Sequence, residues 1–327
     1  MSASVLHGDE RRPDAAPPRR ETPGGEPSLA GRWLAYRLPL SMAVLNGTGL
    51  VALIVLVGLH GVSRTDLAIF LVAYFLGMLG VEVGLHRHFS HRAFEAKPPL
   101  RLTLAVLGAM AGQGSALLWA TNHRKHHRFA DRESDPHAPA PRGPGLAGRL
   151  RGLWHAHFAW HFREVAGIEI RDFQRYSRDL VADRRLMRVD RHFWSWVGLG
   201  LLAPAAAGFV LTGTLHGATT AFLWGGPIRI LFVDNVVWAV NSIAHAFGRR
   251  PFASRDRSTN VAWLAALSLG GGWHNAHHAF PGSARTALVR GQIDPGYWCI
   301  RAFAALGLAD AIQVAKPHAD QPDRSGT

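Results

Sequence analysis

Long apolar runs alternate with polar, arginine-rich segments along the 327 residues of the chain. Four runs, at about residues 40–59, 67–85, 193–211 and 218–240, approach the length of about twenty residues that a helix needs to cross the hydrocarbon layer of a membrane. A short polar break at 63–66 separates the first two, which indicates a helical hairpin. The pattern predicts an all-α integral membrane protein with four transmembrane helices.

A further apolar run at 100–119 differs in composition from these four. It contains Gly108, Gly112, Gln113 and Gly114, which would expose backbone and an amide side chain to lipid. Polar backbone at membrane depth is tolerated where it is buried in protein or lines a cavity. We therefore expect this run to be a re-entrant or interfacial helix.

The two ends of the chain read differently from the middle. Residues 1–30 are rich in Pro, Gly, Arg and Glu, so a disordered N-terminal tail is expected, as it is for residues 317–327. Residues 31–316 then form the membrane domain. No small-residue cleavage pattern follows the first apolar run, so a cleaved signal peptide is not expected.

Positive charge is concentrated beside the apolar runs. The formal net charge is +13, and residues 121–191 alone carry fifteen Arg or Lys. The N-terminal flank, the 86–101 segment and the C-terminal part are also basic, whereas the turns near 60–66 and 212–220 share one Arg. Under the positive-inside rule, both termini and the 121–191 and 241–316 segments are cytoplasmic.

This charge pattern predicts a multi-pass membrane protein with a helical cytoplasmic cap. Basic proteins also bind nucleic acid. However, the positive charge flanks apolar runs, and the sequence has no helix-turn-helix, zinc-finger or RNA-binding motif. We therefore expect contact with membrane lipids and no nucleic-acid partner.

Histidine is the unusual residue, with nineteen copies beside a single cysteine, Cys299. One cysteine excludes a disulfide within the chain and a cysteine-rich metal site. Four histidine clusters stand out, and they contain His86 and His91; His123, His126 and His127; Asn241 and His245; and His274, His277 and His278.

The second and fourth clusters share the spacing H-x-x-H-H, which places three imidazoles on one face of a helix. Imidazole suits zinc, copper, iron and nickel. Nine such ligands are too many for one tetrahedral ion and fit two metals. The histidines without this spacing are interpreted as ordinary surface or core residues: His7, His60, His88, His137, His155, His157, His161, His192, His216 and His318.

The clusters can share a metal pair only if they lie on one side of the membrane. Two predicted spans separate His127 from Asn241, so the chain returns to the same side of the membrane. A single apolar run, 100–119, separates His91 from His123. We therefore predict that this run does not cross, so that all four clusters meet in the cap.

The combined motifs H-x(4)-H, H-x-x-H-H, N-x-x-x-H and H-x-x-H-H resemble those of the membrane fatty acid desaturase family, in particular its delta-9 acyl-CoA and acyl-lipid branch of bacterial type. Further segments share the likeness, which covers about residues 35–315: Asp135–His137, Trp238–Ser242, Gly248–Phe252 and Gly272–Pro281.

The resemblance implies that the nine histidines hold two iron ions and that Asn241 contributes through a water. It implies an O2-dependent enzyme that introduces a cis double bond into a saturated acyl chain carried by CoA, acyl carrier protein or a lipid. Gln113, Trp119 and Trp238 match residues at the kink of the family's substrate tunnel, although ordinary packing would also explain them. Asp131 and Asp135 are either partners of imidazoles or solvated loop charges.

Four departures from the family pattern concern the carrier and the double-bond position. Gly271 stands where the family usually has Glu; Gly114 and Thr121 replace polar or basic residues; and Val237 replaces a tunnel threonine. Two alternatives remain open on the same fold, an acyl hydroxylase and an acetylenase. A more distant alternative is a histidine-rich membrane metal transporter or hydrolase, although transporters place their ligands at the bilayer midplane.

The sequence contains no His-Pro-Gly-Gly haem motif, cysteine-rich iron–sulfur motif or dinucleotide fingerprint. We therefore predict a separate electron donor, such as a ferredoxin, a rubredoxin, a cytochrome b5-like protein or a flavoprotein reductase. The basic cytoplasmic surface would suit an acidic partner.

Overall fold

The computed structural model describes residues 29–59, 61–165 and 167–316. The predicted disordered tails lie outside these residues, apart from Leu29 and Ala30, which begin the first helix. The chain divides into a unit of residues 1–34 and a second unit from Ala35 onward. Apart from the start of α1, at residues 29–34, every feature below belongs to the second unit.

The described chain is mostly helical, with one short antiparallel pair of strands in which Glu95 is opposite Asp310. In chain order, the elements are α1 (Leu29–Leu59), α2 (Arg64–Met78), the π-helix η1 (Leu79–Ser90), β1 (Glu95–Ala96), α3 (Pro98–Met110), α4 (Ala116–Phe129), α5 (Gly145–His157), the 3₁₀ helix η2 (Ala159–Phe162), α6 (Ile170–Tyr176), α7 (Arg178–Val181), α8 (Arg184–Arg191), α9 (Phe193–Thr212), α10 (Leu215–Leu223), the π-helix η3 (Trp224–Ile228), α11 (Arg229–Ser242), the 3₁₀ helix η4 (Ile243–His245), α12 (Ala262–Leu267), α13 (His274–Ala279), α14 (Pro295–Ala305) and β2 (Ala309–Asp310).

Four helical stretches of the described chain are long and apolar enough to cross a membrane: Ala35–Leu59, Arg64–Ser90, Phe193–Thr212 and Leu215–His245. The predicted number of spans is thus confirmed by length and composition. Large apolar side chains point outward from these helices, as Val210 does at 81% exposure. An apolar surface of this kind requires a lipid environment or a partner.

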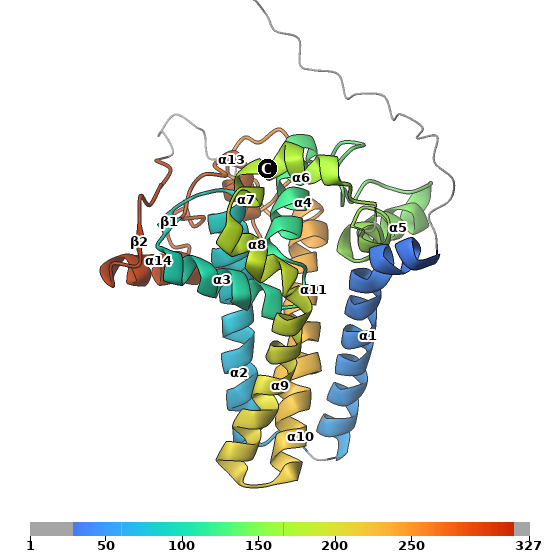
Figure 1. Ribbon diagram of the computed structural model, residues 1–327. Coiled ribbons are helices and arrows are strands. Elements are labelled where there is room, and N and C mark those ends of the chain that lie inside the picture. The colour runs from blue at the N-terminus through green and yellow to red at the C-terminus, as the bar shows by residue number, and fades with distance from the viewer. Residues whose placement is uncertain (1–28, 60, 166, 317–327) are drawn as a thin grey trace, which may run out of the picture. The chain divides into compact units, whose positions relative to one another are not determined.

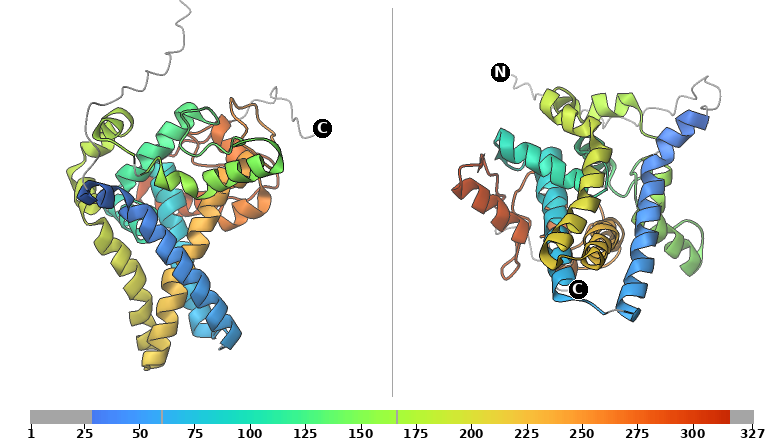
Figure 2. Two further views of the ribbon diagram at one scale, coloured as in Figure 1. Left: turned by 90° about the vertical axis from the view of Figure 1, so that its right-hand side faces the viewer. Right: turned by 60° about the horizontal axis from the view of Figure 1, so that its bottom comes forward.

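The long helices extend away from the segments that carry the histidines (Figures 1 and 2). Close packing depends on small residues, because a Cβ at Gly208 of α9 would lie 2.3 Å from Ala221 Cβ of α10. The helices also bury two charged residues. Asp234 accepts hydrogen bonds from Asn46 and Gln113, and Arg229 donates to the carbonyls of Met110, Gly200 and Gly225. Both charged side chains are therefore satisfied inside the helix bundle.

The apolar run predicted at 100–119 is divided between two helices. α3 ends at Met110 and α4 begins at Ala116, with Gly112 and Gly114 at φ of 84° and 104° between them. A positive φ favours glycine, so these residues form the bend. The 13 residues of α3 span about 20 Å, less than the hydrocarbon thickness of about 30 Å. In Figure 1, α3 lies across the direction of α2 rather than along it.

The packing of α3 against η1 depends on Gly80. A Cβ there would lie 2.4 Å from the backbone of Leu107 and Gly108. We expect Gly80→Ala to lower the free energy of unfolding by about 1–3 kcal/mol, the usual cost of overpacking. Thermal unfolding in detergent measures this effect. Gly58→Ala is the matched control, because a Cβ at Gly58 meets nothing within 4 Å; equal effects of the two substitutions would contradict the packing argument.

Candidate metal centre

The first histidine pair is set by an unusual helix. His86 and His91 are five residues apart, which would place them on different faces of an α-helix. Here α2 continues into a π-helix, and the His91 N–H donates to the His86 carbonyl at 3.2 Å. This i to i+5 bond widens the turn. The backbone thereby brings both imidazoles to one side.

The two H-x-x-H-H motifs lie on α-helices, as their spacing predicts. His123, His126 and His127 occupy α4, whose first turn is capped by Ser115. His274, His277 and His278 occupy the six-residue α13. His245, the remaining predicted ligand, ends η4 just after α11. It therefore lies at the C-terminal end of the fourth long stretch.

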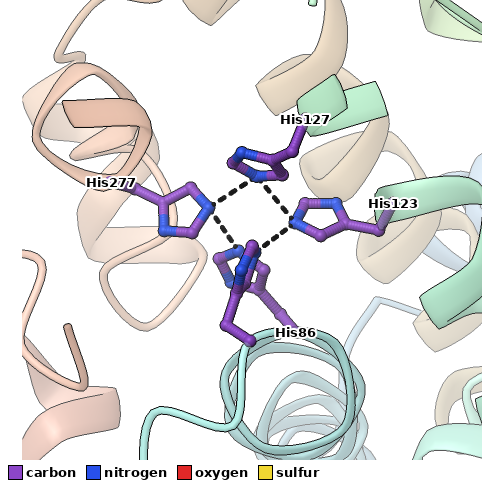
Figure 3. Close-up of side chains that lie close together, drawn as sticks. His86, His123, His127 and His277 are labelled. Carbon is purple, nitrogen blue, oxygen red and sulfur yellow. Dashed lines mark hydrogen bonds between the residues drawn. The ribbon is translucent and has the colours of Figure 1, made fainter. Parts of the chain in front are cut away.

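The structure brings all nine predicted histidines together in two groups. Within each group, one ring nitrogen from every histidine lies within 4.8 Å of those of the others. The first group contains His86, His91, His123, His127 and His277, and the second contains His126, His245, His274 and His278. Figure 3 shows four members of the first group pointing toward one another. The Nε2 atoms of His86 and His277 are 3.0 Å apart, and those of His127 and His277 are 2.9 Å apart.

Four carboxylates hold imidazoles of these groups from behind. In the second group, each of three histidines donates through Nδ1 to one aspartate. The pairs are His126 with Asp135 at 2.9 Å, His245 with Asp131 at 3.1 Å, and His278 with Asp256 at 2.7 Å. In the first group, His86 Nδ1 donates to Glu82 at 3.1 Å. A proton held on Nδ1 leaves the lone pair on Nε2, the arrangement typical of metal-ligating histidine.

The donor set fits metal ions. His126 and His278 both donate through Nδ1, so their Nε2 atoms, 3.3 Å apart, present lone pairs to each other. Such a contact is repulsive unless a cation lies between the two nitrogens. Nine imidazoles in groups of five and four match the nitrogen-rich coordination that iron and its neighbours accept.

Most of these imidazoles are held in the neutral form that binds metal. Burial, followed by repulsion from neighbouring imidazoles, lowers the pKa of six of the nine histidines: His91, His123, His127, His274, His277 and His278. At His126, burial would lower the pKa, but the neighbouring Asp135 carboxylate raises it above its ordinary value. For Asp135, burial would raise the pKa, but His126 and His137 bring it below its usual range. These six imidazoles are therefore expected to be neutral at neutral pH, whereas the Asp135 carboxylate is expected to be ionised.

The carboxylates are distributed unequally between the groups. Three lie behind the second group, whereas the first has Glu82 alone, which also accepts two hydrogen bonds from the Arg87 guanidinium. A Cβ at Gly271 would lie 2.9 Å from Glu82 Oε2. Glu82 therefore fills the space beside Gly271, the position at which the resemblance led us to expect a glutamate.

The predicted tunnel residues lie beside the first group. Gln113, Trp119, Trp238 and Asn241 line one cavity of about 40 Å³ together with His123. Trp119 and Asn241 also line a second cavity of similar volume. Trp119 stacks on His123 with ring centroids 4.7 Å apart, whereas the Gln113 amide is bonded to Asp234. The water-mediated role of Asn241 stays a prediction.

Sequence reasoning left some neighbours of the histidines undecided or missed them. Asp131 and Asp135 had two interpretations, and the structure places both against imidazoles. Glu82 was missed, although its position four residues before His86 on a helix was a usable signal. Asp256 was also missed, since it lies in a loop 22 residues before its partner His278.

Apolar helices of membrane-spanning length that end in a buried cluster of imidazoles are typical of membrane-bound metalloenzymes. The model of the fatty acid desaturase family matches residues 65–292, and the chain belongs to this family.

Several characterised proteins are similar to this chain. Hex-5-enoyl-acyl-carrier-protein acetylenase of Moorena producens is 39% identical over 83% of this chain and 84% of that protein. The sn-1 stearoyl-lipid 9-desaturase of Anabaena variabilis is 32% identical over 75% of this chain and 82% of that protein. Delta-9 acyl-lipid desaturase 1 of Arabidopsis thaliana is 32% identical over 76% of this chain and 75% of that protein.

Metal content offers a test of the carboxylate arrangement. We expect Asp256→Asn and Glu82→Gln each to weaken one group by about 10- to 100-fold in metal affinity, the usual cost of losing such a partner. At limiting iron, each variant should retain about one ion per chain when the wild type retains two, measured by elemental analysis. Glu133→Gln is the control, because this side chain is exposed in the same loop as Asp131. Equal metal content in all four proteins would refute the arrangement.

The buried imidazoles also predict a pH dependence for the metal-free protein. Histidine in the unfolded chain has a pKa of about 6.5. The folded protein binds fewer protons there, because burial lowers the pKa of His274, His277 and His278. The free energy of unfolding should therefore fall as the pH decreases below about 6.5, by up to about 1.4 kcal/mol per pH unit for each such histidine. Thermal unfolding of chelator-treated protein at pH 8 and pH 5.5 measures this; a stability that is unchanged or higher at the lower pH would contradict it.

Proposed function

We propose that this chain is an O2-dependent fatty acyl desaturase that uses two iron ions held by the nine histidines. The proposal depends on one observation: two groups, of five and four imidazoles, lie together in the structure. Beside them are two cavities that are both lined by Trp119. Asn241 is proposed to complete the second group through a water.

The chemistry requires a strong oxidant, because no side chain removes hydrogen from an unactivated methylene. Bound iron would supply it by activating O2. The residues of this chain do the positioning. Trp119, Val237 and His123 line both cavities, so an acyl chain that passes from one cavity to the other runs along the first imidazole group. Small displacements of the reacting carbons there cost a large factor in rate.

The proposed product is a cis double bond in a saturated acyl chain, with the delta-9 position suggested by the resemblance. Acetylenase activity is a second candidate, because a relative that is 39% identical is an acetylenase acting on a hex-5-enoyl chain. Both reactions remove two hydrogens from adjacent carbons. They differ in whether the substrate already contains a double bond.

We propose that the histidine-bearing segments are cytoplasmic, in a bacterial inner membrane, with α3 and α4 on that side and both termini there. The basic flanks support this orientation. A separate electron donor is proposed to dock on the same face. Arg249, Arg255 and Arg257 are exposed there, and the Arg257 N–H donates to Asp131, which holds His245. An acidic donor would match this surface.

Product analysis tests the proposal. Expression of the chain in a host with its own electron donors should add unsaturated acyl chains, identified by mass spectrometry of lipids and acyl thioesters. His277→Ala should abolish the product and lower bound iron, because it removes a donor from the first group. His192→Ala is the control, since this exposed histidine belongs to neither group.

Four results would change the proposal. An alkynyl product from an enoyl substrate would select the acetylenase, and a hydroxylated product would replace both candidates. Full turnover by His277→Ala would refute the metal centre. Purified protein that turned over with NAD(P)H and O2 alone would refute the separate donor.

A further inference from the structure

Several buried polar atoms have no hydrogen-bond partner in the described part of the chain, and two of them belong to aromatic rings beside the metal centre. These two are Trp160 Nε1 and His137 Nδ1, on side chains that are 8% and 4% exposed. Asp135 Oδ1 is 3.8 Å from His137 Nδ1, too far for a hydrogen bond. Leaving such a group buried and unpaired lowers stability, so a partner is expected in the functioning protein.

Both side chains line the cavity that is also lined by the predicted tunnel residues Gln113, Trp119 and Trp238. Trp160 comes from η2 and His137 from the loop after Asp135, and their ring centroids are 5.1 Å apart. His123 of the first imidazole group lines the same cavity. The unpaired atoms therefore lie on the wall of a cavity that reaches the candidate metal centre.

The cavity selects a neutral ligand group. Its lining consists of apolar and aromatic side chains, amides and imidazoles, and contains no Lys, Arg, Asp or Glu. Burial lowers the pKa of His161 in this lining to about 4, so that imidazole is uncharged at neutral pH. A phosphate or carboxylate would find no charged side chain as a partner among the described residues of this lining. Because tryptophan can only donate, the ligand must present an acceptor.

We propose that Trp160 and His137 form a subsite for the carbonyl group of the acyl ester or thioester, whose oxygen accepts the Trp160 indole N–H. The His137 ring forms the adjoining wall and offers a second polar contact. The acyl chain then leads away from this carbonyl, along Trp119, toward the second cavity. This inference rests on the proposed function and names how the substrate's carbonyl end is held.

The test compares ligands that differ by the carbonyl oxygen. Acyl-pantetheine thioesters and the matching thioethers, in which CH2 replaces C=O, are titrated into the metal-loaded, detergent-solubilised protein. We expect the wild type to bind the thioester roughly three- to tenfold more tightly, the contribution of one neutral hydrogen bond. In Trp160→Phe this ratio should fall to about one, with bound metal unchanged. A parallel series of monoacyl glycerolipid esters and ethers distinguishes a lipid from a thioester source.

Two further variants complete the design. Trp154→Phe is the matched control, since Trp154 is 58% exposed and does not line the cavity; it should keep the wild-type ratio. His137→Phe retains a ring against His126 and Trp160 but removes both nitrogens, and it should lower the ratio.

The outcomes are distinct. Equal binding of carbonyl and non-carbonyl ligands by the wild type would overturn the subsite and leave the proposed function intact, because water would then satisfy the two atoms. An undiminished ratio in Trp160→Phe would also overturn it, and one in His137→Phe would remove His137 from the subsite. Failure of every acyl compound to bind would overturn both this inference and the proposed function.

Discussion

The hydrogen bond from an imidazole Nδ1 to a buried carboxylate is the interaction on which the rest of this structure depends. It fixes the ring, its tautomer and the direction of the Nε2 lone pair at once. The carboxylates come from η1 and from two separate loops, since Asp131 and Asp256 lie far apart in the sequence. The loops that carry Asp131 and Asp256 must therefore fold back onto the histidine-bearing helices before the donors can converge. The chain's irregular segments thus contribute to the centre as directly as its helices.

A buried arginine connects this centre to the C-terminal part of the chain. Arg87, adjacent to His86, is 1% exposed and bonds to Glu82, to Asp294 and to the carbonyls of Leu269 and Ala284. A buried charge of this kind is tolerated because its N–H groups find acceptors, two of which are carboxylates. Its contacts hold the segment on both sides of α13 against η1. His86 and His277 of the first group, which come from distant parts of the sequence, are in this way tied to one guanidinium.

The sequence was sufficient for the features that depend on local spacing. Apolar runs predicted four spans, and the repeated H-x-x-H-H motif predicted two imidazole triplets, each on one helix face. The bend between α3 and α4 was read as part of one helix, because apolar residues continue through Gly112 and Gly114 and only the backbone dihedrals reveal the break. Contacts between distant loops, such as Asp256 with His278, leave no periodic trace in a sequence. The unpaired atoms of Trp160 and His137 are likewise a property of packing, which no motif records.

The π-helical stretch that carries His86 and His91 has a consequence for transplanting this centre. Its wider turn makes a five-residue interval equivalent, in direction, to the three- and four-residue intervals of α4 and α13. A designer who copied the same interval onto a straight α-helical scaffold would aim one of the two rings away from the ions. The motif therefore specifies the arrangement of the donors only on a π-helical backbone, and the same residue spacing in another scaffold would not reproduce it.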